Sequence, residues 1–250
     1  MATSKYFAVT VKPTIAASIQ AEAAYSQADV LFDWHAFDIP KGAARLVGVT
    51  ALVRQTNGTG ANILPFHVYY AKSIDGVAPS SLGTVHATAN GTGYYNNIIG
   101  KNNIEVKDFA DDYLDVGVHV AALAAGGADS DKPSTVLQGE PDSGTNVGYD
   151  RLYVAGLCGV SGVFDFASTV TCTGVQPITQ AVLTVGTTSA LSNFAVGDIL
   201  HDEDDRLLGT VKSMDSTTQM TMTANLENAT VNAKDVYNIS PITLILSFER

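Results

Sequence analysis

Charged residues are scarce in this 250-residue sequence, where Asp, Glu, Lys and Arg together make up 16% against about 25% in an average globular domain. Basic residues are fewer than acidic ones, with 14 Lys and Arg against 25 Asp and Glu, so the formal net charge is −11. Such a chain has no long-range attraction to polyanions, and we expect it to bind neither nucleic acid nor a membrane. Hydrophobic residues still make up 46%, which excludes a disordered chain.

Long hydrophobic runs are also missing. The longest weakly charged apolar stretch, residues 116–125, is much too short to cross about 30 Å of hydrocarbon. The apolar run near the N-terminus stops at Lys12 and Pro13, before it reaches the length of a signal-peptide core. Ala21 to Ala23 match the small-x-small pattern of a signal-peptide cleavage site, but a polar stretch precedes them where a signal peptide has its apolar core. We therefore expect a soluble protein without a secretory signal.

Cysteine is nearly absent, because Cys158 and Cys172 are the only two. Two cysteines do not make a disulfide framework, and neither has a second ligand at the spacing of a zinc site. They fall on neighbouring predicted strands, so a bond between them stays possible. We favour small buried thiols that pack as apolar groups.

Alternation of apolar and polar residues recurs along the chain, whereas no window holds the i, i+3, i+4, i+7 stripe of an amphipathic helix. The sequence therefore predicts an all-β protein, with an antiparallel β-sandwich or jelly roll as its architecture. Short helical turns are expected only at residues 16–24 and 108–113. The predicted strands of this sandwich span residues 6–11, 45–54, 63–72, 151–158, 163–173 and 242–248.

Turn signals separate these strands. The dipeptide Asn57–Gly58, with Gly60 after it, predicts a hairpin between strands 45–54 and 63–72. Pro65 cannot donate to a ladder and is expected at an edge or at the beginning of its strand. The loop at residues 126–148 is long for a compact domain and is therefore a candidate contact arm.

Residues 177–239 differ in composition from the rest of the chain, because Tyr and Trp become rare while Thr and Met become more frequent. Five short strands in about sixty residues indicate a small barrel. We interpret this segment as a module inserted into a sandwich formed by residues 1–176 and 240–250, with Pro177 and Pro241 at the two crossings. The expected strands of the module are 181–185, 194–200, 207–211, 219–223 and 236–239.

Acidity is concentrated in the second half of the chain, above all in His201-Asp202-Glu203-Asp204-Asp205. This run lacks the glycine and the final glutamate of an EF-hand loop. We interpret it as a solvated hairpin tip of the module; cation binding at Asp202–Asp205 is the alternative.

No catalytic constellation emerges from the motifs. Residues 93–101 superficially resemble a phosphate loop, but the glycines are too far apart. Ser161 lacks the flanking glycines of a nucleophile elbow and is interpreted as a turn residue. The histidines form no metal-binding or triad pattern, so we expect a protein that is not an enzyme and has no catalytic, cofactor or metal-binding residues. The five histidines of the sequence are His35, His67, His86, His119 and His201.

The most distinctive aromatic cluster surrounds Trp34. Together with Tyr94 and Tyr95 it could form a platform that stacks on sugars. Strict alternation instead places Phe32, Trp34 and Ala36 on one side of a strand, which is what the core of a sandwich requires. We favour the core interpretation.

Two sets of segments resemble virion proteins of tailed bacteriophages. The first set resembles a small β-module found repeatedly in these proteins, and it covers about a quarter of the chain. The second set resembles structural proteins of marine phages such as cyanophages. The segments are 194–198, 208–216 and 218–222 in the first set, and 32–42, 71–73 and 79–83 in the second.

The resemblance implies a virion component, assembled in the cytoplasm of a bacterial host, and it supplies no catalytic residues. A head decoration or cement protein is the leading expectation, with the major capsid protein and copies of itself as partners in an oligomeric assembly. A neck or tail accessory protein, or a host-recognition carbohydrate-binding β protein, is the alternative. The expected contact segments are the N-terminal stretch through Gln27 and the loop 126–148.

Overall fold

The computed structural model describes residues 5–20, 24–54, 64–105, 118–124, 136–139, 149–164, 166, 170–186 and 193–250. Its regular structure is almost entirely β, which confirms the predicted class; beside the strands there are only a four-residue helix and one 3₁₀ turn within these residues. The elements are β1 (Tyr6–Val11), α1 (Ala17–Gln20), β2 (Val30–Pro40), β3 (Ala44–Arg54), β4 (Phe66–Lys72), η1 (Tyr95–Asn97), β5 (Ile98–Ile104), β6 (Val118–Ala124), β7 (Val136–Leu137), β8 (Tyr149–Cys158), β9 (Val182–Thr184), β10 (Ile199–Asp202), β11 (Leu207–Met214), β12 (Gln219–Met222), β13 (Val236–Asn238) and β14 (Ile242–Glu249).

Two antiparallel sheets form a jelly roll. The first has the order β1-β14-β3-β6, with the short β7 beside β3, and the second has the order β2-β8-β4-β5. Along the chain the long strands pass from one sheet to the other at every step except β4 to β5, which pair as neighbours. This alternation between two facing sheets is the topology of a jelly roll, so the predicted sandwich is confirmed.

The hairpin predicted at Asn57–Gly58 is wrong. β3 pairs with β14 and β6 in the first sheet, whereas β4 pairs with β5 and β8 in the second. The connection between them therefore crosses from one sheet to the other, although residues 55–63 themselves lie outside the described residues. β4 begins at Phe66, directly after Pro65, as expected for a residue without a backbone donor.

One apolar core fills the space between the sheets. In β14 every second residue from Ile242 to Phe248 is buried, and the residues between them are only partly covered. Phe248 stacks on Phe7 of β1 with ring centroids 5.1 Å apart, and it also lies 6.4 Å from the ring of Phe37 in β2. Because burying such a side chain contributes about 1.5–3 kcal/mol, Phe248 helps to hold the two sheets together.

A second, separate core lies inside the inserted module. Its strands follow the order β13-β10-β11-β12-β9. The ends of this sheet are joined by Thr171, which bridges to Asp235, and by Cys172, which bridges to Val185. In its described residues, the segment expected as a strand at 163–173 supplies only these isolated bridges, which connect the two ends of a curled, barrel-like sheet. We call this sheet with its core the barrel. Since Val170 and Cys172 belong to the barrel core, its packing begins before the expected crossing at Pro177.

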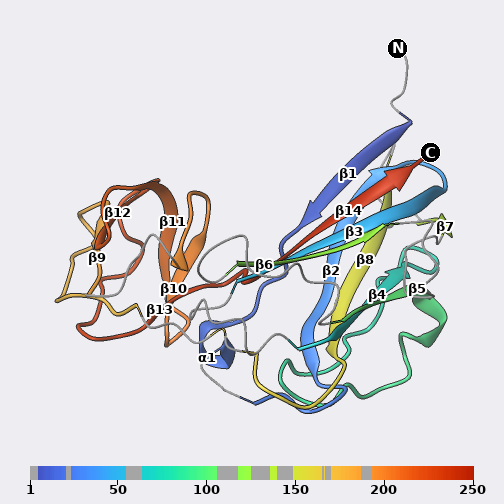
Figure 1. The fold of residues 1–250 in the computed structure, drawn as a ribbon, viewed down its shortest axis with the longest axis horizontal. Coiled ribbons are helices and arrows are strands. Elements are labelled where there is room, and N and C mark those ends of the chain that lie inside the picture. The colour runs from blue at the N-terminus through green and yellow to red at the C-terminus, as the bar shows by residue number, and fades with distance from the viewer. Residues whose placement is uncertain are drawn as a thin grey trace.

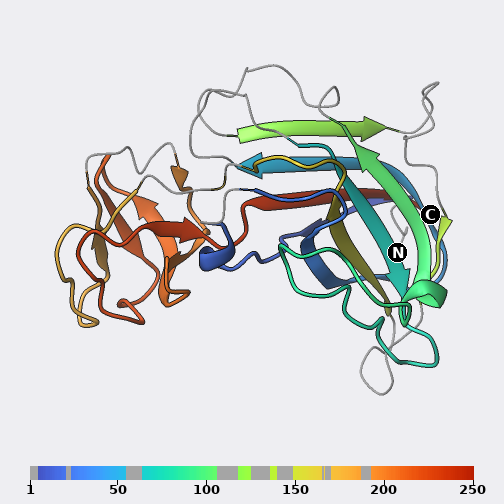
Figure 2. The ribbon, with the colours of Figure 1, turned by 90° about the horizontal axis from the view of Figure 1, so that it is seen from below.

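The barrel and the sandwich lie at opposite ends of the longest axis, and α1 lies between them in both views (Figures 1 and 2). The barrel occupies the connection from β8 to β14, the last crossing between the two sheets. In the described part of the chain, no helix has the length and apolarity that crossing a membrane requires.

Candidate functional site

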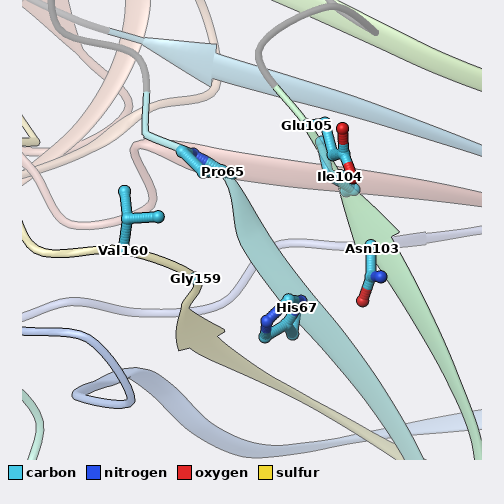
Figure 3. Close-up of a pocket in the computed structure, with 7 residues that line it drawn as sticks. All are labelled: Pro65, His67, Asn103, Ile104, Glu105, Gly159 and Val160. Carbon is cyan, nitrogen blue, oxygen red and sulfur yellow. The ribbon is translucent and has the colours of Figure 1, made fainter.

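A pocket of about 390 Å³ opens at one end of the second sheet. Figure 3 shows the side chains of His67 and Asn103, which are register partners on β4 and β5, extending to the same side. Gly159 donates its backbone N–H to the carbonyl oxygen of Pro65 over 2.8 Å, and a Cβ at Gly159 would lie 2.9 Å from that oxygen. The close approach therefore requires glycine. The lining residues are Pro65, His67, Asn103, Ile104, Glu105, Gly159 and Val160.

This pocket is suited to holding a small polar molecule. The imidazole of His67, the carboxamide of Asn103 and the carboxylate of Glu105 can exchange hydrogen bonds, while Pro65 and Val160 give it an apolar wall. The lining contains neither a serine nor a cysteine. None of the residues that line this pocket was singled out as a site from the sequence.

Trp34, Tyr94 and Tyr95 do come together, on the outer face of the second sheet. The ring centroids of Trp34 and Tyr94 are 6.2 Å apart and those of Tyr94 and Tyr95 are 5.2 Å apart, both pairs edge to face. The indole Nε1 of Trp34 donates to the carbonyl oxygen of Ser80 over 2.9 Å. Tyr94 is buried, and this burial raises the pKa of its hydroxyl, whereas Tyr95 is 60% exposed. We call these three residues the aromatic trio.

The expectation that Phe32, Trp34 and Ala36 all face the core is wrong beyond Phe32. Phe32 is buried in the main core, but Trp34 packs in a separate cluster outside it and Ala36 is exposed. The register of β2 against β8 shifts between Phe32 and His35. Such a bulge reverses the alternation of the strand, so that Phe37 becomes a buried residue farther along it.

An ion pair connects the sandwich to the barrel. Arg54, the last residue of β3, pairs with Asp198, which lies just before β10. The side chain of Asp198 is 5% exposed and also accepts the backbone N–H of Ala195 over 2.8 Å. The predicted strand at 194–200 is thus a turn up to Asp198, and only its last residues belong to β10.

The segment around α1 adds further contacts to the barrel. Ser18 donates both its hydroxyl and its backbone N–H to the carboxylate of Asp205, over 2.5 and 3.1 Å. The side-chain amide of Gln20, itself buried, donates to the carbonyl oxygens of Ile15 and Asn238, both over 2.8 Å. We call the contacts Arg54–Asp198, Ser18–Asp205 and Gln20–Asn238 the joint.

The acidic run is the β10–β11 turn, as predicted, but the solvated interpretation is wrong for Asp202. This carboxylate is completely buried, accepts the backbone N–H groups of Asp204 and Arg206 over 3.1 and 3.0 Å, and forms an ion pair with Arg206. Glu203 pairs with Lys234, whose hydrogen bond lowers the pKa of that carboxyl. Among the described residues no group of three or more His, Cys, Asp or Glu is placed to hold a metal ion.

The histidines are dispersed over the fold. His35, His67, His119 and His201 lie on strands, and the side chain of His119 is outside the described parts. His86 differs, because its backbone is left-handed, with φ 65°, and its Nε2 lies 2.5 Å from the carbonyl oxygen of Ala24. Nothing in the sequence signalled this contact. Ser161 lies in a bend, as predicted, where its hydroxyl accepts the backbone N–H of Gln27.

The two cysteines are free and buried in different cores. Cys158 belongs to the sandwich core and Cys172 to the barrel core, so the open question of a bond between them is answered. Burial raises the pKa of each thiol to about 12. The expectation of small buried thiols is confirmed.

The expected N-terminal contact arm is part of the fold in its described residues. Residues 6–11 form β1, the predicted helical turn is α1, and Ile15, Ala17 and Tyr25 are buried. Of the loop 126–148, only residues 136–139 are described, and they include β7, which pairs with β3. The remainder of that loop and the helical turn expected at 108–113 lie outside the described residues.

Compared with known proteins, the chain matches no family model and no curated protein.

Proposed function

We propose that the chain is a structural protein of a tailed-phage particle that binds the outside of the capsid shell as a decoration or cement protein. The observation that carries the proposal is the strand order β1-β14-β3-β6 facing β2-β8-β4-β5. Jelly rolls of this kind recur in viral capsid domains and in lectins, and the argument from them is an analogy of fold. The resemblance of the barrel segments to phage virion modules points in the same direction.

The joint supports an adhesive mechanism. A protein that bridges neighbouring shell subunits must transmit force between its own two parts, and the buried Asp198 with its partner Arg54 connects these parts. Each contact with the shell then needs only the standard area of about 800 Å² per partner. Repetition over many copies makes the total attachment strong although each contact is weak. The net charge of −11 fits a protein that stays off the packaged DNA.

The test uses a phage whose genome encodes this chain. Particles produced without the chain are mixed with the purified protein, and its retention on particles after sedimentation is measured together with the temperature at which DNA is released. Saturable retention and a higher release temperature are expected, because a ligand that binds only the intact shell stabilises it. Absence of the chain from wild-type particles would contradict the proposal.

A second candidate, carbohydrate binding, is favoured by the aromatic trio. The exposed ring of Tyr95 is held edge to face by the buried Tyr94, and a fixed aromatic ring is a surface on which a sugar can stack at small entropic cost. A panel of bacterial surface glycans tests it. Loss of binding in Tyr95→Ala, with binding kept in Tyr6→Ala, would support this candidate; Tyr6 is the matched control because it is 58% exposed on β1.

A further inference from the structure

A second pocket, of about 150 Å³, lies between the sandwich and the barrel, at the beginning of β14 (Figure 1). The sandwich contributes the segment directly after β1 and the ends of β3 and β14. The barrel contributes the turn before β10 and the end of β13. A single buried water needs about 10–15 Å³, so this pocket has room for an ion of several atoms.

Strand alternation turns three polar side chains of the sandwich toward this pocket. Lys12, Arg54 and Thr243 each follow or precede a core residue in the first sheet, so all three face away from the core. Because β14 lies between β1 and β3, Thr243 lies between the two cations. The core residues next to them are Val11, Val53 and Leu244.

The pocket is rich in hydrogen-bond donors. In the described part of the chain, Lys12 forms no ion pair, and the hydroxyl groups of Thr14, Ser240 and Thr243 have no hydrogen-bond partner. Arg54 directs one Nη1 donor to Asp198. A guanidinium group carries five N–H donors, so this ion pair leaves the others available to a ligand.

The charge of the lining is positive although the chain as a whole is acidic. Lys12 and Arg54 contribute two positive charges and Asp198 one negative charge, and no other charged residue lines the pocket. This surplus positive charge contrasts with the net charge of −11 for the whole chain. Cations and hydroxyl groups that converge in this way suit an anion with several acceptor oxygens.

We propose that the second pocket binds a small tetrahedral oxyanion of the phosphate class. Lys12 and Arg54 supply the opposing charge, and the hydroxyl groups of Thr14, Ser240 and Thr243 donate to its oxygens. A bound ion would connect the sandwich to the barrel beside the joint. The inference goes beyond the proposed function because it concerns a small-ion site on the isolated chain and holds whatever larger partner the chain has.

The test is a calorimetric titration of the intact protein with inorganic phosphate at pH 8, with the ionic strength held constant by sodium chloride. Saturable binding of one ion per chain is expected. Acetate is the comparison probe, because it carries one charge and two oxygens. Its affinity should be at least about fivefold lower. Absence of saturable phosphate binding, or equal affinity for acetate, would overturn the proposal.

A pair of lysine variants separates the pocket from general attraction to positive charge. Lys12→Gln is expected to weaken phosphate binding at least about fivefold, because it removes a charge-assisted hydrogen bond. The matched control is Lys212→Gln, which removes the same charge from an exposed position on β11, outside the pocket. This control should bind phosphate like the wild type. Equal weakening in the two variants contradicts a site at this pocket.

A hydroxyl variant gives a readout that leaves the charge unchanged. Thr243→Val keeps the shape of the side chain and removes one donor, so phosphate binding should weaken about threefold. Thr50→Val is its control, because Thr50 lies on β3 outside the pocket and is likewise partly covered. If Thr243→Val does not fold, as judged by circular dichroism, Ser240→Ala replaces it. Wild-type affinity in the pocket variant would overturn the assignment of its hydroxyl group to the ion.

Discussion

Arg54 and Asp198, which are 144 residues apart in the sequence, form an ion pair that connects the last residue of β3 to the turn before β10. The carboxylate is almost completely buried, whereas the side chain of Arg54 is 31% exposed. A buried carboxylate that loses its cation keeps its desolvation cost without the compensating attraction. The sandwich and the barrel are therefore coupled through one pair of charges.

Replacing Arg54 by leucine is expected to lower the free energy of unfolding by about 2–4 kcal/mol, because Asp198 stays buried without its partner. Urea unfolding followed by tryptophan fluorescence and circular dichroism measures the change. Adding Asp198→Asn to Arg54→Leu should restore part of the loss. The matched control is Arg151→Leu, since Arg151 is about as exposed as Arg54 but its partner Asp38 has a side chain that is 40% exposed. That control should cost less than about 1 kcal/mol; an equal loss in both variants would contradict the role of the joint.

Cys158 and Cys172 report on the two cores separately. At pH 8, burial that raises both thiol pKa values to about 12 should slow alkylation about a thousandfold relative to the unfolded chain, because only the thiolate reacts. Along a urea series, mass spectrometry of the labelled peptides gives the urea concentration at which each core unfolds enough for its cysteine to react. We expect Cys172 to react at a lower urea concentration, because it lies in the smaller core. Labelling of Cys158 first would contradict this order.

Gly156 is required by the packing of Phe32. A Cβ at Gly156 would lie 2.3 Å from Cε1 of the fully buried Phe32 ring, so Gly156→Ala is expected to destabilise the fold by about 1–3 kcal/mol. Gly48→Ala, in β3, is the control, because its new Cβ would lie 3.4 Å from Cβ of Ser247. Thermal unfolding should show a clear decrease for the first variant and little change for the second. Equal melting temperatures for the two variants would show that the ring moves freely.

Alternation in the sequence was sufficient to locate β1, β3 and β14, because one side of each strand faces a core and the other does not. β8 was located as well, although both of its sides are buried, with Val154 in the main core and Ala155 in the cluster that contains Trp34. The same rule failed in β2, where a bulge after Phe32 reverses the phase and moves Trp34 out of the main core. A bulge depends on the register of a distant strand, here β8, and so leaves no local signal. For the same reason Asn57–Gly58 predicted the wrong partner for β3, since a crossing and a hairpin can begin with the same turn residues.

The pocket and the joint could not be predicted from the sequence for a similar reason, because each depends on segments that only the fold brings together. His67 lies on β4, whereas Asn103 lies on β5 and Glu105 directly after it, so His67 meets the other two only because β4 and β5 pair. Asp198 and Asp202 are two acidic residues in an acidic region, and only the fold shows that both are buried. The acidic composition thus predicted a solvated turn where part of the charge is structural.

Alkaline pH is expected to destabilise the protein through Cys158 and Cys172. The thiol of an unfolded cysteine has a pKa of about 8.5, whereas burial raises the pKa of each of these two thiols in the folded protein to about 12. Their contribution is therefore complete below the unfolded pKa and is lost as the pH rises toward 12, by about 1.4 kcal/mol per pH unit for each thiol. Urea unfolding between pH 7 and about 10.5 measures this slope. The double variant Cys158→Ala, Cys172→Ala should have a shallower slope, and an unchanged slope would assign the loss to other groups.

Electron cryomicroscopy of the particles of a phage that encodes this chain tests the proposed function most directly. The account predicts density on the outer surface of the shell that fits the jelly roll and the barrel as two connected bodies, with contacts to more than one shell subunit. Density for the chain inside the shell against the DNA, or particles that lack it altogether, would contradict the account.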